Sequence, residues 1–260
     1  MGLLEGKVAI VSGVGPGLGR DIAVAFAREG ADVVLGGRTE AKLAKVAAEI
    51  DEPGRRALVV VADVTDPAAC DALVTRAAAE LGGIDVLVNN AFHDGDHKRF
   101  LDADLDDWRA TMEVNLFGAL TMTRAAVPHL AASGDGRVIM INTMSTQRIQ
   151  PRWGAYAASK SALAAATKTL AAELGPQGIR VNGVHPGYIW GDSVEWWFNH
   201  QAERRGVTFD EVYQEVAGET ALGYLPSSAE IAGTVVYLAS ELARPVTGQA
   251  ISVNAGHWFA

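Results

Sequence analysis

The chain has 260 residues, of which 49% are hydrophobic and 20% are charged, and its formal net charge is −9. This balance suits one globular domain with ample material for a core. The negative charge argues against nonspecific binding to nucleic acid or to an acidic membrane surface. A single cysteine, Cys70, excludes an intramolecular disulfide and suits a reducing compartment. Neither a signal-peptide pattern nor a membrane-length apolar run is evident, so we expect a soluble cytoplasmic protein.

Short runs rich in valine and isoleucine alternate with alanine-rich helical patterns along the chain. Consecutive apolar positions in such short runs are typical of strands buried on both faces of a parallel sheet. The runs lie at residues 7–13, 31–37, 56–64, 84–91, 137–143, 179–187 and 249–254. Clear helical patterns lie at residues 18–30, 68–83, 161–175 and 227–240. This alternation predicts a single α/β domain with a doubly wound, mostly parallel sheet and helices on both faces.

The first predicted strand ends in a glycine-rich turn. Gly13, Gly17 and Gly19 have the spacing G-x-x-x-G-x-G, and Gly15 adds a fourth glycine. Glycines let the backbone approach a pyrophosphate, and a helix that begins near Gly17 would point N–H groups at it. A merely tight turn is the alternative, which the position at the first strand–helix junction disfavours. The turn therefore predicts a dinucleotide site.

The end of the second predicted strand bears on the choice of cofactor. It reads Gly36-Gly37-Arg38, without the carboxylate that would bind the ribose hydroxyls of NAD. Arg38 can instead pair with a ribose 2′-phosphate through charge-assisted hydrogen bonds. An exposed arginine at a helix start is the alternative. We favour NADP(H) and keep NAD(H) open.

Two irregular stretches interrupt the alternation. The polar loop at residues 92–104 follows the fourth strand, and an insertion at about 188–226, with one or two helices, precedes the last helix. Ligands of open α/β sheets bind at the carboxyl ends of the strands, where both stretches should lie. We expect the insertion to form a substrate lid. Its Trp190 and Trp197 either line an apolar substrate pocket or pack within the lid. The histidines and aspartates at 93–97 indicate a solvated loop rather than a metal site.

Tyr156 and Lys160 lie four residues apart in a segment predicted to be helical through Leu174. This spacing places both side chains on one face. A free tyrosine has a pKa of about 10, and a neighbouring ammonium lowers that pKa by stabilising the phenolate. An isolated pair of this kind is usually a surface feature. Here it follows a dinucleotide turn and a buried strand, which favours a catalytic acid/base pair.

Taken together, these motifs resemble the short-chain dehydrogenase/reductase family over nearly the whole chain. The matching residues are the glycine turn, Asp63-Val64, the NNA triplet at 89–91, Asn115, Tyr156-x-x-x-Lys160 and Pro186-Gly187. The resemblance implies a seven-stranded Rossmann sheet, hydride transfer between a nicotinamide and a carbonyl or alcohol, and usually a homotetramer. It also implies that Tyr156 is the general acid/base, that Lys160 binds the ribose and lowers the tyrosine pKa, and that Asn115 holds a water in the proton relay. The expected cofactor contacts are Gly13, Gly15, Gly17, Leu18, Gly19, Arg38, Asp63, Val64, Asn90, Ala91, Tyr156, Lys160, Pro186, Gly187 and Ile189.

The family places a serine thirteen residues before the tyrosine, and this chain has Thr143 there. We predict that Thr143 orients the substrate carbonyl, with Ser145 as a second contact or substitute, because alternate strand residues face the same side. Thr143 could instead only pack. The chain departs from the family pattern at Phe92, at Gly191 and in the tail at 254–256, and these departures leave the nicotinamide contacts and the substrate open.

The sequence thus predicts an NADP(H)-dependent oxidoreductase that interconverts a small-molecule ketone and a secondary alcohol, without a metal. An NAD-dependent alcohol dehydrogenase of the same family is one alternative. A non-catalytic dinucleotide-binding scaffold or redox sensor is another, and the presence of Asn115, Tyr156 and Lys160 together disfavours it.

Overall fold

The structure, a computed structural model, describes residues 2–50 and 54–259. Seven parallel strands form one sheet in the order β3-β2-β1-β4-β5-β6-β7. Each predicted strand is present, with bounds that differ from the apolar run by a few residues. The strands are β1 (Val8–Ser12), β2 (Asp32–Gly37), β3 (Ala57–Val61), β4 (Val86–Asn89), β5 (Gly136–Ile141), β6 (Ile179–Pro186) and β7 (Ala250–Val253).

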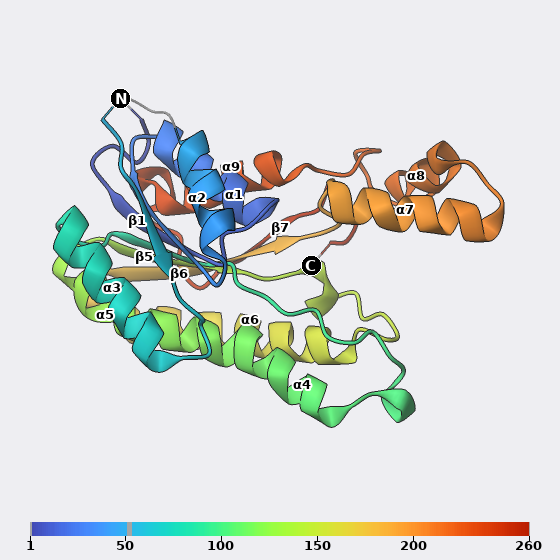
Figure 1. The fold of residues 1–260 in the computed structure, drawn as a ribbon, viewed down its shortest axis with the longest axis horizontal. Coiled ribbons are helices and arrows are strands. Elements are labelled where there is room, and N and C mark those ends of the chain that lie inside the picture. Colours follow the sequence, from blue (N-terminus) through green and yellow to red (C-terminus); the bar gives the residue numbers. More distant parts are fainter. Residues whose placement is uncertain (1, 51–53, 260) are drawn as a thin grey trace.

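Helices cover both faces of the sheet, as the alternation predicted (Figure 1). On one face lie α1 (Leu18–Arg28), α2 (Glu40–Glu49) and α9 (Ser228–Ala239), and on the other lie α3 (Pro67–Leu81), α5 (Ala119–Ala132) and α6 (Gly154–Leu174). Each face has its own apolar core, which includes Phe26 and Val235 on the first and Met122 and Leu163 on the second. The sheet is therefore buried on both faces, which explains why its strands are apolar at consecutive positions.

Local signals set several helix ends. Asp66 caps α3 by accepting a hydrogen bond from the amide of Ala68 at 2.9 Å, and Gly82 ends the helix in the left-handed conformation. The capping-box pattern of Ser227 and Glu230 is formed at the start of α9. These ends hold the helices at fixed places on the sheet.

The carboxyl ends of β4 and β6 lead into the two irregular stretches. The loop after β4 contains the short helix η1 (Phe100–Asp102) and leads into α4 (Leu105–Met112), while the insertion after β6 contains α7 (Asp192–Arg205) and α8 (Phe209–Gly218). These two helices extend beyond the sheet and appear in orange in Figure 1. They enclose a small apolar cluster that includes Phe198, Val212 and Leu225.

The described chain has five short helices besides α1 to α9. They are η1, already named, η2 (Glu113–Gly118), η3 (Met144–Thr146), η4 (Gly175–Gln177) and η5 (Glu241–Ala243). Of these, η2 is a π-helix between α4 and α5, and η3 lies directly after β5. In the described part of the chain, no helix has the length and apolar character that crossing a membrane requires.

Candidate active site

The glycine turn brings the backbone of β1 against the segment after β4. A Cβ on Gly13 would lie 2.3 Å from the amide nitrogen of Ala91, and Gly13 has a φ of 87°. A Cβ on Gly19 would lie 2.7 Å from the carbonyl oxygen of Gly13, which already accepts a hydrogen bond from Asn90 Nδ2 at 2.7 Å. Only glycine fits these two positions, since the neighbouring atoms are mostly backbone.

The turn is open on its other side, above the N-terminus of α1. A Cβ on Gly15 or Gly17 would meet nothing within 4 Å, and Gly17 precedes Leu18, the first residue of α1. Free N–H groups at such a helix start attract anions. The open space and the free N–H groups of this turn therefore suit the pyrophosphate of a dinucleotide.

A cavity of about 270 Å³ continues from the turn across the carboxyl ends of β1, β2 and β3. Its lining joins six residues predicted to contact the cofactor: Gly13, Gly15, Arg38, Asp63, Val64 and Ala91. Thr39 and Lys42 also line it, although no motif in the sequence marked either residue. The four-residue spacing of Arg38 and Lys42 was a signal that could have found the second cation.

The charges in this cavity have separate roles. Asp63 Oδ1 accepts hydrogen bonds from the amide and the hydroxyl of Thr65, at 3.0 and 2.8 Å. The amide bond is the main cause of a lowered pKa for Asp63, and the charge of Arg38 adds to it. Arg38 and Lys42 are exposed at the rim. The cavity thus offers two cations beside the end of β2, where the sequence lacks a carboxylate.

Tyr156 and Lys160 project from the first turns of α6 toward the end of β5. The ammonium of Lys160 lies 5.9 Å from the centroid of the Tyr156 ring and donates to the carbonyl oxygen of Ile141 at 2.7 Å. Lys160 is only 2% exposed. Burial therefore lowers the pKa of Lys160 to about 7.

Tyr156 shows the opposite shift from the one expected. Although the residue keeps some contact with solvent, burial around its hydroxyl raises the pKa of Tyr156 to about 12, and the charge of Asp94 adds to the rise. A hydrogen bond with the side chain of Thr143 opposes it. Burial outweighs the interaction with Thr143, and Lys160, whose own pKa is lowered to about 7, is neutral where the phenol would ionise, so lowering the pKa of Tyr156 requires a positive charge beside it. Near neutral pH the phenol holds its proton and is ready to donate it.

Thr143 stands at the end of β5 and caps η3. Its hydroxyl accepts a hydrogen bond from the amide of Ser145 at 3.2 Å and lies 3.3 Å from the Ser145 hydroxyl. The structure therefore brings Thr143, Ser145 and Tyr156 together. Behind them, the Thr146 hydroxyl donates to the carbonyl oxygen of Thr143 at 3.0 Å and lies 3.2 Å from Nδ1 of buried His185. The sequence analysis missed this support.

Asn115 lies in the π-helix η2 and is 1% exposed. Its side-chain oxygen accepts from the amide of His93 at 2.7 Å, and its nitrogen donates to the carbonyl of His93 at 2.8 Å and to the Ser159 hydroxyl at 2.9 Å. A π-helix frequently marks a functional site. Asn115 thus joins the loop after β4 to α6 one residue from Lys160.

Comparisons with known proteins agree with this geometry. A family model described as enoyl-(acyl carrier protein) reductase matches residues 13–257. The chain belongs to the short-chain dehydrogenase/reductase family. Members bind nicotinamide dinucleotides, and the chain is an oxidoreductase of this class.

Similar members cover nearly the full chain. The short-chain reductase protein NovJ of Streptomyces niveus is 36% identical over 96% of this chain and 93% of its own. The 7alpha-hydroxysteroid dehydrogenase of Escherichia coli K12 is 31% identical over 97% of this chain and 94% of its own. The crystal structure of L-sorbose reductase from Gluconobacter frateurii, complexed with NADPH and L-sorbose, is 33% identical, with a TM-score of 0.92 over 99% of this chain and 98% of that one.

The remaining predicted contacts of this dehydrogenase/reductase lie after β6. Pro186 ends the strand, and a Cβ on Gly187 would lie 2.8 Å from the Cβ of Asn254. Ile189 packs against the core on the α1 side. These positions line the base of the insertion, and their contact with a cofactor stays a prediction.

The two tryptophans predicted to contact substrate differ in their surroundings. Trp190 packs edge-on against Tyr213 and Phe198 within the apolar cluster of the insertion, with ring centroids 5.0 and 5.9 Å away. Trp197 is 36% exposed and stacks on Tyr188 at 6.2 Å. Trp190 therefore packs within the insertion, one of the two alternatives that its sequence left open, while Trp197 keeps a free surface.

A polar contact ties the insertion to the segment between η3 and α6 and to the C-terminal tail. Glu219 accepts a hydrogen bond from Arg148 at 2.8 Å, and His257 Nε2 lies 3.0 Å from the same carboxylate oxygen. The hydrogen bond with His257, followed by that with Arg148, lowers the pKa of Glu219. We call these three residues the insertion tether.

The polar loop after β4 faces Tyr156 through an aromatic pair. Trp153 lies 4.0 Å from the ring of His97 and 5.7 Å from that of Tyr156. Two acidic side chains pair separately with the loop's histidines, Asp94 of the loop with His97 at 3.6 Å and Asp107 of α4 with His93 at 3.3 Å. No group of three such side chains suited to a metal occurs among residues 2–50 and 54–259.

Proposed function

We propose that this chain is an NADP(H)-dependent oxidoreductase that interconverts a ketone and a secondary alcohol, with Tyr156 as general acid and base. The observation that carries the proposal is the meeting of three side chains at the end of β5. The side chain of Thr143 lies close enough to the Tyr156 hydroxyl to lower its pKa, and the Lys160 ammonium lies 5.9 Å from the Tyr156 ring. A hydroxyl that donates a proton, a second hydroxyl that orients the substrate and a cation are what carbonyl reduction requires of a protein.

Each side chain would have a defined task. Thr143 donates a hydrogen bond to the substrate carbonyl and holds it beside the phenol, with Ser145 as a second contact. Tyr156 delivers its proton to the carbonyl oxygen in reduction and removes it in oxidation. Lys160, in its protonated form, supplies the positive charge that stabilises the phenolate, and Asn115 fixes the neighbouring loop. Bound NADP(H) supplies the hydride.

The preference for NADP(H) is supported by the charges at the end of β2. Arg38 and Lys42 line the cavity beside Gly37, and residues 36–39 at the end of β2 include no carboxylate to bind the ribose hydroxyls of NAD. Two cations suit a 2′-phosphate. The solved L-sorbose reductase is an NADPH complex, which supports the same choice. NAD-dependent alcohol oxidation stays the alternative.

Three further proposals come with this function. Residues 188–226 act as a substrate lid on a single domain, since they hold two helices and a core of their own at the carboxyl edge of the sheet. The chain forms a homo-oligomer, a tetramer by family resemblance. It works on a small-molecule carbonyl or alcohol in the cytoplasm.

The catalytic assignment is tested with Tyr156→Phe, which removes the hydroxyl and keeps the ring. Turnover should fall by roughly 10²–10⁴-fold, because proton transfer by a positioned side chain contributes about that much. NADPH binding, followed by fluorescence titration, should be unchanged. Tyr237→Phe on the exposed side of α9 is the matched control. Substantial activity of Tyr156→Phe on an accepted carbonyl would overturn the assignment.

The cofactor assignment is tested by titrating NADPH and NADH in parallel. Arg38→Gln should weaken NADPH binding by roughly 10–100-fold and leave NADH binding nearly unchanged, since a charge-assisted bond is worth about 1.5–3 kcal/mol. Arg28→Gln, on the exposed end of α1, is the control. Equal binding of NADH and NADPH by the wild type would favour the NAD alternative. Binding of neither would favour the non-catalytic scaffold.

A further inference from the structure

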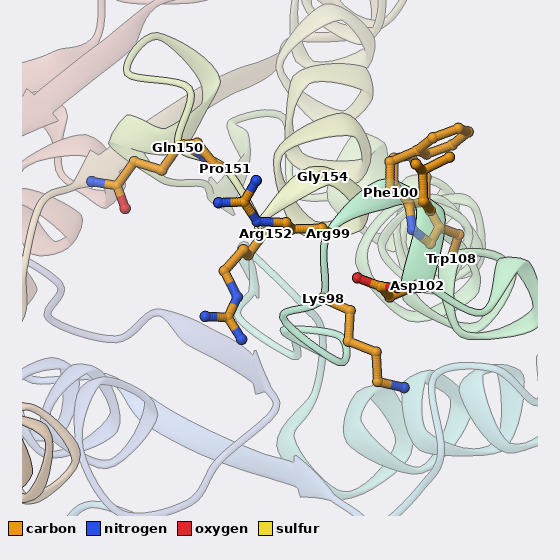
Figure 2. A pocket seen from close by; sticks show the side chains of 10 residues that line it. Lys98, Arg99, Phe100, Asp102, Trp108, Gln150, Pro151, Arg152 and Gly154 are labelled. Carbon is orange, nitrogen blue, oxygen red and sulfur yellow. The ribbon is translucent and has the colours of Figure 1, made fainter.

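A second cavity, of about 500 Å³, lies outside the dinucleotide cavity. It is formed where the polar loop after β4 and the start of α4 meet the segment that leads into α6 (Figure 2). Its size is in the range of small-molecule sites. The lining residues are Lys98, Arg99, Phe100, Leu101, Asp102, Trp108, Gln150, Pro151, Arg152 and Gly154.

The cavity has a polar, cationic side and an aromatic side. In Figure 2 the side chains of Arg99, Arg152 and Gln150 extend on one side, and the rings of Phe100 and Trp108 lie on the other. The two rings meet edge to face at 6.2 Å. The described lining residues include three cations, of which Lys98 pairs with Asp96 at 3.1 Å, and one carboxylate, Asp102. A guanidinium group without a carboxylate partner attracts anions.

Most acidic side chains near this cavity are engaged elsewhere, whereas Asp102 lines the cavity itself. Arg99 and Arg152 form no ion pair with a carboxylate in the described part of the chain, and the single bond of Arg152 runs to a backbone carbonyl. The neighbouring acids have these partners: Asp96 with Lys98, Asp106 with Arg109, Asp107 with His93 and with the amide of Asp96, and Asp104 with the amide of Asp106. Two guanidinium groups are thus left to bind an anion from outside.

The backbone also holds Arg152 in an unusual conformation. Arg152 has a φ of 78° and His97 a φ of 50°, both in the left-handed region that non-glycine residues rarely adopt. The Nε of Arg152 donates to the carbonyl oxygen of His97 at 2.9 Å, so the two positions support each other. A glycine would relieve the strain at residue 152. The presence of an arginine in this strained conformation indicates that its side chain has a function.

We propose that this cavity binds an organic anion, a carboxylate or phosphate carried on a flat apolar body. The guanidinium groups of Arg99 and Arg152 bind the anion through charge-assisted hydrogen bonds, and Phe100 and Trp108 pack against the apolar body. This site does not depend on the proposed reaction. It lies near the catalytic tyrosine, since Trp153, next to Arg152, contacts the Tyr156 ring at 5.7 Å.

The test is a calorimetric titration of the full chain, saturated with NADPH, with 2-naphthoate and with its neutral analogue 2-naphthylmethanol. Naphthoate should bind, and the alcohol should bind at least roughly tenfold more weakly, because a hydrogen bond to a charged group is worth about 1.5–3 kcal/mol. Raising the salt concentration should weaken naphthoate binding. Equal binding of the two probes, or no binding of naphthoate, would overturn the proposal.

Variants locate the bound probe. Arg99→Gln and Arg152→Gln should each weaken naphthoate binding by roughly tenfold, and Arg109→Gln, a surface arginine on α4, should leave it unchanged. Arg152→Gly removes the guanidinium and relieves the left-handed φ, so it tests the side chain in a chain that folds at least as well. Unchanged naphthoate affinity in both Arg99→Gln and Arg152→Gly would refute this site.

A kinetic comparison identifies the source of the anion. If the anion belongs to the substrate, Arg99→Gln should lower kcat/KM for a carboxylate-bearing ketone and spare a neutral ketone. If it belongs to a separate molecule, naphthoate should change the turnover of the neutral ketone without competing with it. Both outcomes support the site and differ in its use.

Discussion

Replacing Lys160 with methionine should remove a pH dependence of stability that this buried lysine imposes on the fold. Its pKa is about 7 in the folded chain and 10.5 when unperturbed. Between these values the unfolded chain holds a proton that the folded chain does not. Stability therefore rises with pH in this window, as it must wherever the unfolded state binds more protons.

The size of the effect follows from the two pKa values. One pKa unit corresponds to about 1.4 kcal/mol. At pH 7 the folded lysine is half protonated, and at pH 9 it is neutral, whereas the unfolded lysine stays largely protonated at both. The wild type should therefore gain roughly 2 kcal/mol in its free energy of unfolding between pH 7 and pH 9 from this residue.

Urea denaturation of the cofactor-free protein at pH 7 and pH 9, at one protein concentration, measures this gain. Lys160→Met also loses the hydrogen bond to Ile141, but that loss applies at both pH values and cancels in the difference. Lys168→Met, an exposed lysine on the same helix, should keep the wild-type gain. An equal pH dependence in wild type and Lys160→Met would show that Lys160 remains charged when folded and would refute the reasoning.

Three further predictions concern the turn, the loop and the insertion. Gly19→Ala should weaken NADPH binding at least roughly tenfold, since a cap on α1 that is displaced no longer aims its N–H groups at the phosphates, while Gly83→Ala, outside the dinucleotide cavity and with open space around its Cβ, should bind as wild type; fluorescence titration compares them. Asn115→Ala should lower the free energy of unfolding by about 2–4 kcal/mol, because buried backbone groups of the loop lose their hydrogen-bond partner. A loss of less than about 0.5 kcal/mol, measured by urea denaturation, would contradict this. Glu219→Gln should loosen the insertion tether, raise KM a few-fold and speed amide hydrogen exchange in α7 and α8. Glu203→Gln, the control, should change neither KM nor the exchange rates. Unchanged exchange in Glu219→Gln would show that the tether does not hold the insertion.

The pH behaviour of the tether has the opposite sign from that of Lys160. The pKa of Glu219 is lowered by its partners, so its contribution to stability is present above the unperturbed carboxyl pKa of 4.5 and is lost as pH falls through the folded value. Raising the pH from 7 to 9 should therefore leave this contribution unchanged, which keeps the Lys160 measurement free of it.

Sequence patterns within short segments predicted the strands, the glycine turn and the pairing of Tyr156 with Lys160. Apolar runs marked the strands because a parallel sheet with helices on both faces buries consecutive residues. Glycine spacing marked the turn because only residues without a Cβ fit against Ala91 and Asn90. The four-residue spacing of Tyr156 and Lys160 placed both on one face of α6, since a helix repeats every 3.6 residues. These signals depend on neighbours a few residues away, so they can be read along the chain.

Tertiary structure alone decided what depends on distant segments. One such feature is the order of the strands. Others are contacts between residues far apart in sequence: Asn115 with His93, Thr146 with His185, and Trp190 with Tyr213 within the insertion. The direction of the Tyr156 pKa was also beyond prediction, because spacing showed a nearby lysine but not the burial that raises the pKa of Tyr156 and lowers that of Lys160. Burial is a property of the packed whole, summed over every segment that surrounds a side chain, and no local pattern contains it.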